Sequence, residues 1–191
     1  MSTLHVIDFE GTRASGVTEY GVVTLVGGEV MGTRTAECTG KFDEHLDMFI
    51  KLRKNGTFVG HNASVEDRLL RHYAASPGFV KKCSSSSELG TAWGVWIDTK
   101  ILYRAFFCNL PDYSLGGLVK KFELTERLSF LANKFCPAHK LGYHSAMFDA
   151  LATCVLLENL TAELQKNGLR VSDELLLEYS RSKKFLKQSS H

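Results

Sequence analysis

The stretch Leu4-His5-Val6-Ile7-Asp8-Phe9-Glu10-Gly11-Thr12 decides the fold, because it places two carboxylates in what otherwise reads as a buried strand. Successive side chains of a strand point to opposite faces, so Asp8 and Glu10 share one face. Ile7 and Phe9 share the other. Two like charges side by side raise each other's pKa unless a positive charge lies between them, and a divalent metal ion commonly fills that role. Taken alone, the pattern fits equally well a strand end whose acids lie in solvent.

The composition predicts a single soluble domain with reduced cysteines. The chain has 191 residues, of which 44% are hydrophobic and 23% charged, enough for one domain with a full core. A net charge of +2 neither indicates nor excludes a nucleic-acid partner, because a local basic patch can exist in a nearly neutral protein. The five cysteines include no Cys-x-x-Cys pair, which is typical of free thiols and argues against a zinc site. No signal sequence or bilayer-length apolar stretch is present, so we expect a cytoplasmic protein without membrane contact.

The order of the periodic segments predicts an α/β fold. Strand patterns cover residues 4–9, 18–26 and 30–36, and a Gly-Gly pair at 27–28 joins the last two in a hairpin. A mixed sheet with helices packed on it is expected, because alternating helices and strands follow these three strands. The further expected segments are helices from 43 to 55 and after 62, strands at 57–60 and 95–97, a serine-rich loop at 84–94, and helices at 99–107, 114–122, 126–134 and 145–167.

The end of the chain is expected to add one more amphipathic helix over residues 171–185. A basic run at 181–187 follows, and we expect it to be solvated rather than bound to nucleic acid. The chain is therefore divided into a main domain, residues 1–168, and a C-terminal helix and tail, residues 169–191.

A second chemical signal is the segment 58–70, where a strand passes through a polar turn into a helix with acids in its first turn. Ser64 as N-cap with Asp67 three residues later would make a capping box, which accounts for Asp67. Glu66 is not needed for capping and lies beside the core-facing residues. It is therefore the better candidate ligand.

A third signal is His144, which directly precedes a helix and is followed five residues later by Asp149. The small residues Ala146, Ala150 and Cys154 form a narrow stripe that can lie close to the sheet. Asp149 at the edge of this stripe could then point at the carboxylates of the first strand. A lone histidine is usually structural, and His144 is a catalytic candidate only because Asp149 and the carboxylates of the first strand are expected beside it.

These motifs, in this order, resemble those of the DEDDh 3′-to-5′ exonucleases, the DnaQ-like group that includes bacterial proofreading subunits, ribonuclease T and oligoribonuclease. Asp8-Phe9-Glu10 is similar to the first motif, residues 60–70 to the second, and residues 144–149 to the third. Residues 98–99 and 113–118 are similar to intervening family segments. The resemblance covers about residues 4–160. It implies a ribonuclease H-like fold, with a central mixed five-stranded sheet flanked by helices.

The ligand of the second motif departs from the family, which usually has aspartate there. Matching His61-Asn62-Ala63-Ser64 without a gap places Glu66 at the ligand position. Choosing Asp67 needs a one-residue shift, which moves Leu69 and Leu70 off the positions expected for core residues. We favour Glu66, and Asp67 remains open.

The resemblance implies a two-metal phosphodiesterase. Four carboxylates, Asp8, Glu10, Glu66 and Asp149, would hold two Mg²⁺ or Mn²⁺ ions, and His144 would act as general base. It further implies that Phe9, Gly11 and Thr12 lie near the terminal nucleotide, and that His61 and Asn62 line the cleft. Trp93 and Trp96 are expected in the core instead.

Three functions follow, in order of preference. The first is a 3′-to-5′ exonuclease acting on single-stranded or frayed DNA, in repair or proofreading. The second keeps the chemistry with an RNA substrate, as in ribonuclease T and oligoribonuclease, because recognition of the 2′-hydroxyl separates the two. The third is a catalytically silent domain that binds nucleic acid or a protein. A polymerase or repair partner and a homodimer are both left open.

Overall fold

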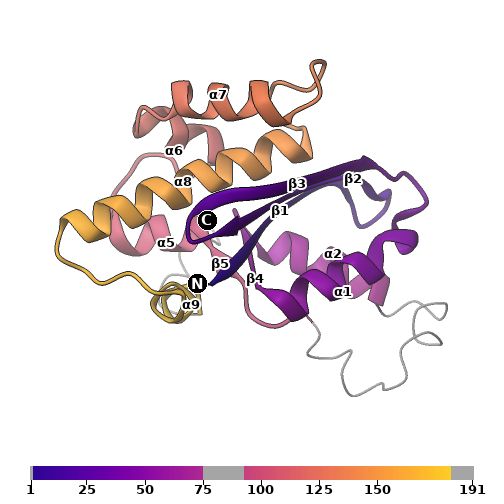
Figure 1. Cartoon of the computed structure of the whole chain (residues 1–191), viewed down its shortest axis with the longest axis horizontal. Helices are drawn as coiled ribbons and strands as arrows, with labels where there is room; N and C mark the ends of the chain where they lie inside the picture. Colours follow the sequence, from indigo (N-terminus) through magenta and orange to yellow (C-terminus); the bar gives the residue numbers. More distant parts are fainter. Residues whose placement is uncertain (1, 75–92, 182–191) are drawn as a thin grey trace.

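The computed structural model describes residues 2–74 and 93–181 and shows a five-stranded mixed sheet with helices on both faces (Figure 1). The strand order is β3-β2-β1-β4-β5. The strands are β1 (Thr3–Thr12), β2 (Gly16–Val26), β3 (Glu29–Glu37), β4 (Thr57–Gly60) and β5 (Ile97–Asp98). The first three strands pair antiparallel, whereas β4 and β5 continue the sheet in parallel with β1. The structure confirms the predicted α/β class.

The helices form two layers, one on each face of the sheet (Figure 1). On one side lie a short 3-10 helix, η1 (Phe42–His45), and the helices α1 (Leu46–Asn55) and α2 (Ser64–Ala74). On the other side, α8 (Ala146–Lys166) lies along the strands, with α6 (Leu115–Lys121) and α7 (Thr125–Phe135) beyond it. The helices α5 (Thr99–Phe106) and α9 (Asp173–Ser180) pack against each other near β5. No helix in the part of the chain that the structure describes is both long and apolar enough to span a bilayer.

The alternation along β1 divides the two cores. Ile7 and Phe9 belong to the cluster under α1 and α2, which is rich in aromatic rings. Val6 belongs to the cluster under α8. Asp8 and Glu10 lie on the Val6 face by the period of a strand, so both acids face the layer that contains α8.

Gly21 brings α8 unusually close to the sheet. This glycine lies opposite Asp8 in the pairing of β1 with β2. A Cβ atom at this position would collide with the carbonyl group of Ala146, in the first turn of α8. A glycine inside a strand often marks such a close backbone approach. The first turn of α8 can therefore lie directly over the strand that carries the acids.

The structure differs from the expected segments mainly near β5 and at the end of the chain. Residues 95 and 96 precede the strand, which has only two residues. The helix α9 ends at Ser180, earlier than expected, and the predicted tail lies outside the described residues except Arg181. The serine-rich loop also lies outside them, apart from its last two residues. The cysteines that the structure describes are free thiols, as predicted.

Candidate functional site

Three potential metal ligands meet where β1 ends and α8 begins. One side-chain atom each of Glu10, His144 and Asp149 lies within 4.8 Å of the others. Glu10 comes from β1, Asp149 from the first turn of α8, and His144 from the loop before that helix. The structure thus brings two of the four predicted carboxylates together with the predicted base.

His144 is held in position through its backbone. Its N–H group donates a hydrogen bond to Asp149 Oδ2 at 3.1 Å. Its backbone has a φ of +67°, a left-handed conformation that is uncommon for a residue with a side chain. The side chain is exposed. Burial raises the pKa of Glu10, and the charge of His144 offsets part of this rise. The imidazole therefore lies beside the acids and remains open to solvent.

Two further acids lie near this group: Glu66 is buried and Asp8 is half-buried. Burial raises the pKa of Asp8 well above its ordinary range, and the charges of Glu66, Asp149 and Glu10 raise it further. Burial also raises the pKa of Glu66 to about 8, and that of Asp149 to about 6. Neither Asp8 nor Glu66 belongs to the group of ligand atoms within 4.8 Å, so they lie near it without completing it.

The adjacent acids Glu66 and Asp67 have different environments. Glu66 is 5% exposed, and its Oε2 atom is buried without a hydrogen-bond partner in the described chain. Asp67 is paired through Oδ2 with Arg71 Nε at 2.7 Å, although its Oδ1 atom has no partner. Of the two acids, Glu66 is the one whose charge acts most strongly on Asp8.

The predicted capping box does not form. The helix α2 already includes Ser64, and the N–H group of Asp67 donates to the carbonyl of Ala63 at 3.0 Å. The turn before α2 is instead held by Asp98, at the end of β5. The Asp98 carboxylate accepts hydrogen bonds from the N–H groups of Asn62 and Ala63 and caps α5 at the same time. Asp98 therefore fixes the start of the helix that carries Glu66.

His61 is tied into the protein by both ring nitrogens. Nε2 lies 3.0 Å from the carbonyl of Tyr113, and because a carbonyl only accepts, Nε2 carries the proton. Nδ1 lies 2.9 Å from the hydroxyl of Thr99. Burial lowers the pKa of His61 to about 4, so the ring is neutral at pH 7. Only its carbon edge and ring faces could meet a substrate, whereas the side chain of Asn62 is exposed.

The residues predicted near the terminal nucleotide also have structural contacts. The ring of Phe9 is buried against Phe42 and Phe49, on the face of β1 away from the acids. Gly11 has a φ of +128°, and a Cβ atom there would collide with the carbonyl of Gly16. The hydroxyl of Thr12 accepts a hydrogen bond from the N–H group of Ser15 at 3.0 Å. Gly11 and Thr12 thus shape the turn at the edge of the site.

Glu19 is a fifth acid at the site that the sequence analysis missed. It lies opposite Glu10 in the pairing of β1 with β2 and is 8% exposed. Its Oε2 atom lies 2.6 Å from Lys140 Nζ, and Lys140 also pairs with Glu37 of β3. Finding Glu19 from the sequence would have required pairing the first two predicted strands in their correct register, because directly opposite residues share a face. Lys140 in turn fastens the loop before α8 to the sheet.

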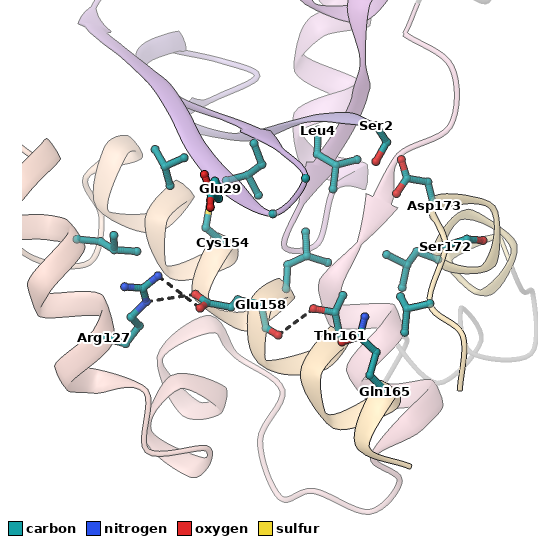
Figure 2. Close-up of a pocket in the computed structure, with 18 of the residues that line it drawn as sticks. Ser2, Leu4, Glu29, Arg127, Cys154, Glu158, Thr161, Gln165, Ser172 and Asp173 are labelled. Carbon is teal, nitrogen blue, oxygen red and sulfur yellow. Dashed lines mark hydrogen bonds and ion pairs between the residues drawn. The ribbon is translucent and has the colours of Figure 1, made fainter. Parts of the chain in front are cut away.

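A hollow of about 550 Å³ lies near the other end of β1, and Figure 2 shows its lining. Leu4, Glu29 and Cys154 are among the residues around it. Arg127 and Glu158 on its wall form an ion pair, with Nε and Oε2 3.2 Å apart. None of the predicted site residues lines this hollow.

The residues present fit divalent metal ions. Glu66 Oε2 and Asp149 Oδ1 are buried and have no hydrogen-bond partner in the described residues. Leaving such oxygens unsatisfied is costly, and a cation would satisfy them. Carboxylate oxygens are the ligands that Mg²⁺ and Mn²⁺ prefer.

Comparison with known proteins supports the fold. No family model matches the sequence, and no curated protein matches it. Among solved structures, the chain is similar to Exonuclease X in complex with 5′ overhanging duplex DNA, with a TM-score of 0.58 and 21% sequence identity. The match covers 93% of this chain and 99% of the other. At this identity the likeness shows a shared fold.

Proposed function

We propose that the protein is a metal-dependent 3′-to-5′ exonuclease that releases nucleoside 5′-monophosphates from single-stranded or frayed DNA ends. The observation that carries the proposal is the meeting of Glu10, Asp149 and His144 within 4.8 Å, beside half-buried Asp8 and buried Glu66. Strongly perturbed carboxylates gathered at one place are typical of catalytic sites. The shared fold with Exonuclease X, which was solved with DNA, supports DNA as the substrate.

Asp8, Glu10, Glu66 and Asp149 would hold the two divalent cations, Mg²⁺ or Mn²⁺. Bound cations there would neutralise the phosphodiester, lower the pKa of an attacking water and stabilise the leaving 3′ oxygen. The raised pKa values of Asp8, Glu66 and Asp149 are consistent with this role, because desolvation and neighbouring acids favour the neutral carboxyl groups, and a bound cation would favour the charged ones. Glu66 rather than Asp67 is the ligand from α2, because Arg71 already pairs with Asp67.

His144 would act as general base by accepting a proton from the attacking water. The hydrogen bond from its N–H group to Asp149 places the imidazole next to the acids, and its exposure leaves it accessible to that water. An imidazole can accept and release a proton near neutral pH. Lys140 and Glu19 hold the preceding part of the loop against the sheet.

The substrate would enter past Gly11 and Thr12, at the carboxyl end of β1. Phe9 would contribute through its backbone, because its ring is packed in the core. Asn62 would offer its exposed amide to the sugar or phosphate, and His61 a neutral ring surface. Residues 1–168 would form the catalytic domain, with the segment from 169 onward packed beside it through α9.

The decisive experiment uses single-stranded DNA and RNA of the same sequence, each labelled at the 5′ end. Each is incubated with Mg²⁺, with Mn²⁺ or with chelator, and the products are separated by length. We expect stepwise shortening of the DNA from its 3′ end, only with metal. Shortening of RNA alone would replace DNA by RNA as the substrate. If neither polymer is shortened by folded, metal-loaded protein, the protein is a silent binding domain instead.

A further inference from the structure

A second hollow, of about 540 Å³, opens beside the acids, between the end of β1 and one side of α2. Its floor includes the apolar residues Val65 and Leu69 of α2, together with Gly11. Its polar lining consists of Thr12, Arg13, Arg68, Arg71 and His72. Three arginines and a histidine line the hollow, and no carboxylate is among the described residues that line it. This distribution is opposite in sign to that of the neighbouring acids.

The backbone that presents Arg13 is well fixed. The hydroxyl of Ser15 accepts a hydrogen bond from the N–H group of Thr12 at 2.9 Å, and Thr12 accepts one from Ser15 in return. The hydroxyl of Tyr73, on α2, accepts a hydrogen bond from the N–H group of Val17 at 2.8 Å. The turn is thereby tied both to itself and to α2. Arg13 is exposed and makes no ion pair with any residue that the structure describes.

The arginines of α2 are oriented by their own helix. Arg68 Nε donates to the carbonyl of Ser64 at 2.9 Å, and Arg71 Nε donates to Asp67 at 2.7 Å. Both side chains are exposed to a large extent, so these contacts set their direction without burying their charge. Arg68 also lowers the pKa of Glu66, which places its charge close to the site.

We propose that this arginine hollow binds a phosphate of the nucleic-acid backbone, separate from the phosphate that is cleaved, with the attached sugar or base over Val65 and Leu69. Guanidinium groups match phosphate geometry, and apolar surface suits the sugar and base. Arg13 follows Glu10 by three residues, so their Cα atoms are at most about 11 Å apart. On each strand of a duplex, phosphates recur about every 3.4 Å of helix axis, so one only a few nucleotides from the cleaved bond can reach the hollow.

The proposal rests on the proposed function for the identity of the polymer, and it explains how an acidic site retains a polyanion. The acids of the metal site repel the substrate wherever cations do not neutralise them. A basic hollow beside them supplies attraction that does not depend on metal. It also adds contacts only for substrates longer than one nucleotide.

The test compares a double variant, which carries both Arg13→Gln and Arg68→Gln, with the control variant Arg127→Gln. Arg127 is similarly exposed but lies on the wall of the far hollow (Figure 2). Binding of a labelled 20-nucleotide DNA is measured by fluorescence anisotropy in chelator, over a series of salt concentrations. We expect Kd to rise about tenfold in the double variant, and the salt dependence to fall by about one unit per arginine. A Kd within twofold of the control would overturn the proposal.

A second readout separates this proposal from the proposed function. The p-nitrophenyl ester of thymidine 5′-monophosphate has one phosphate and cannot reach the arginine hollow while it reacts. We expect the loss of kcat/KM on the 20-nucleotide DNA to exceed the loss on this ester by about tenfold. Equal losses would contradict the arginine hollow. If the wild-type protein cleaves neither substrate, the proposed nuclease function is refuted. Phosphate binding by the arginine hollow is then decided by the anisotropy measurement alone.

The source of the phosphate is decided by two DNA substrates. One is single-stranded, and the other is a duplex with a recessed 3′ end. Equal weakening on both shows that the hollow holds the strand being shortened. Weakening on the duplex alone shows that it holds the paired strand.

Discussion

The two ends of β1 differ in how their charges are satisfied. At the first end, the hollow of about 550 Å³ has acids and bases on its wall, and Arg127 pairs with Glu158 (Figure 2). At the other end, Asp8, Glu66 and Asp149 have raised pKa values, and one oxygen each of Glu66 and Asp149 is buried without a partner among the described residues. Stability alone would favour the first arrangement. The unsatisfied carboxylates are the reason that we place the proposed site at the second end.

The largest expected difference between the two ends is catalytic. Asp149→Asn should reduce nuclease turnover by at least roughly 10³-fold, because losing a metal ligand removes several kcal/mol of transition-state stabilisation. Glu158→Gln, on the same helix but on the wall of the hollow at the other end of β1, should leave turnover within about twofold. Rates on 5′-labelled DNA measure both. Equal effects of the two changes would show that the acids at the carboxyl end of β1 have no special role.

The next effect concerns the base beside the acids. His144→Ala should lower kcat by at least about 10²-fold, because no other described imidazole belongs to the metal-ligand group. Binding of Mn²⁺, followed by calorimetry, should persist, because the carboxylates remain. Turnover close to that of the wild type would remove His144 from the mechanism.

A stability measurement contrasts the adjacent acids of α2. Glu66 has a pKa raised to about 8 in the folded state, against an ordinary 4.5, so its protonated form is favoured by folding. Its stabilising contribution is complete below pH 4.5 and is lost as pH rises toward 8. Glu66→Gln should therefore raise the Tm of metal-free protein at pH 8 by several degrees. The corresponding gain in the free energy of unfolding is on the order of a few kcal/mol at most.

Asp67→Asn is the matched control for that measurement. It removes an exposed ion pair with Arg71, which is worth no more than about 1 kcal/mol, and should lower Tm slightly. Thermal unfolding in chelator at pH 5 and pH 8 gives both values. A lower Tm for Glu66→Gln at pH 8 would contradict the burial of an uncompensated charge.

The smallest expected effect tests the close approach of α8 to β2. Gly21→Ala should destabilise the protein by about 1–3 kcal/mol, because the added methyl group meets the backbone at Ala146. Gly32→Ala in β3 adds the same methyl group where no atom lies within 4 Å and should have a small effect. Urea unfolding measures both. If the two variants are equally stable, α8 has room to shift at that point.

The sequence predicted the elements of the fold well, because alternation and helical periodicity are strong along this chain. The predicted strand at 95–97 was misplaced. Trp96 packs on Phe58 before the strand begins, and the strand ends at Asp98, which is the N-cap of α5. The same carboxylate also accepts hydrogen bonds from the N–H groups of Asn62 and Ala63, which lie far away in the sequence. No local pattern could have shown it.

The candidate site was predicted from motifs, and the structure adds what depends on pairing across the sheet. The placement of Glu19 opposite Glu10 needs the register of β1 with β2. The engagement of both His61 nitrogens depends on Thr99 and Tyr113, which come from separate segments. The roles of the predicted site residues remain predictions, which the variants above test.

Because both tryptophans are buried, their intrinsic fluorescence can report on the unfolding of the protein. Trp93 and Trp96 are 0% and 6% exposed and pack against Phe58, on the face of the sheet opposite α8. No nucleobase can stack on either indole without opening that layer. Their fluorescence emission should therefore shift to longer wavelength when the layer unfolds. It should stay constant during substrate titrations, so folding and binding can be followed independently in one sample.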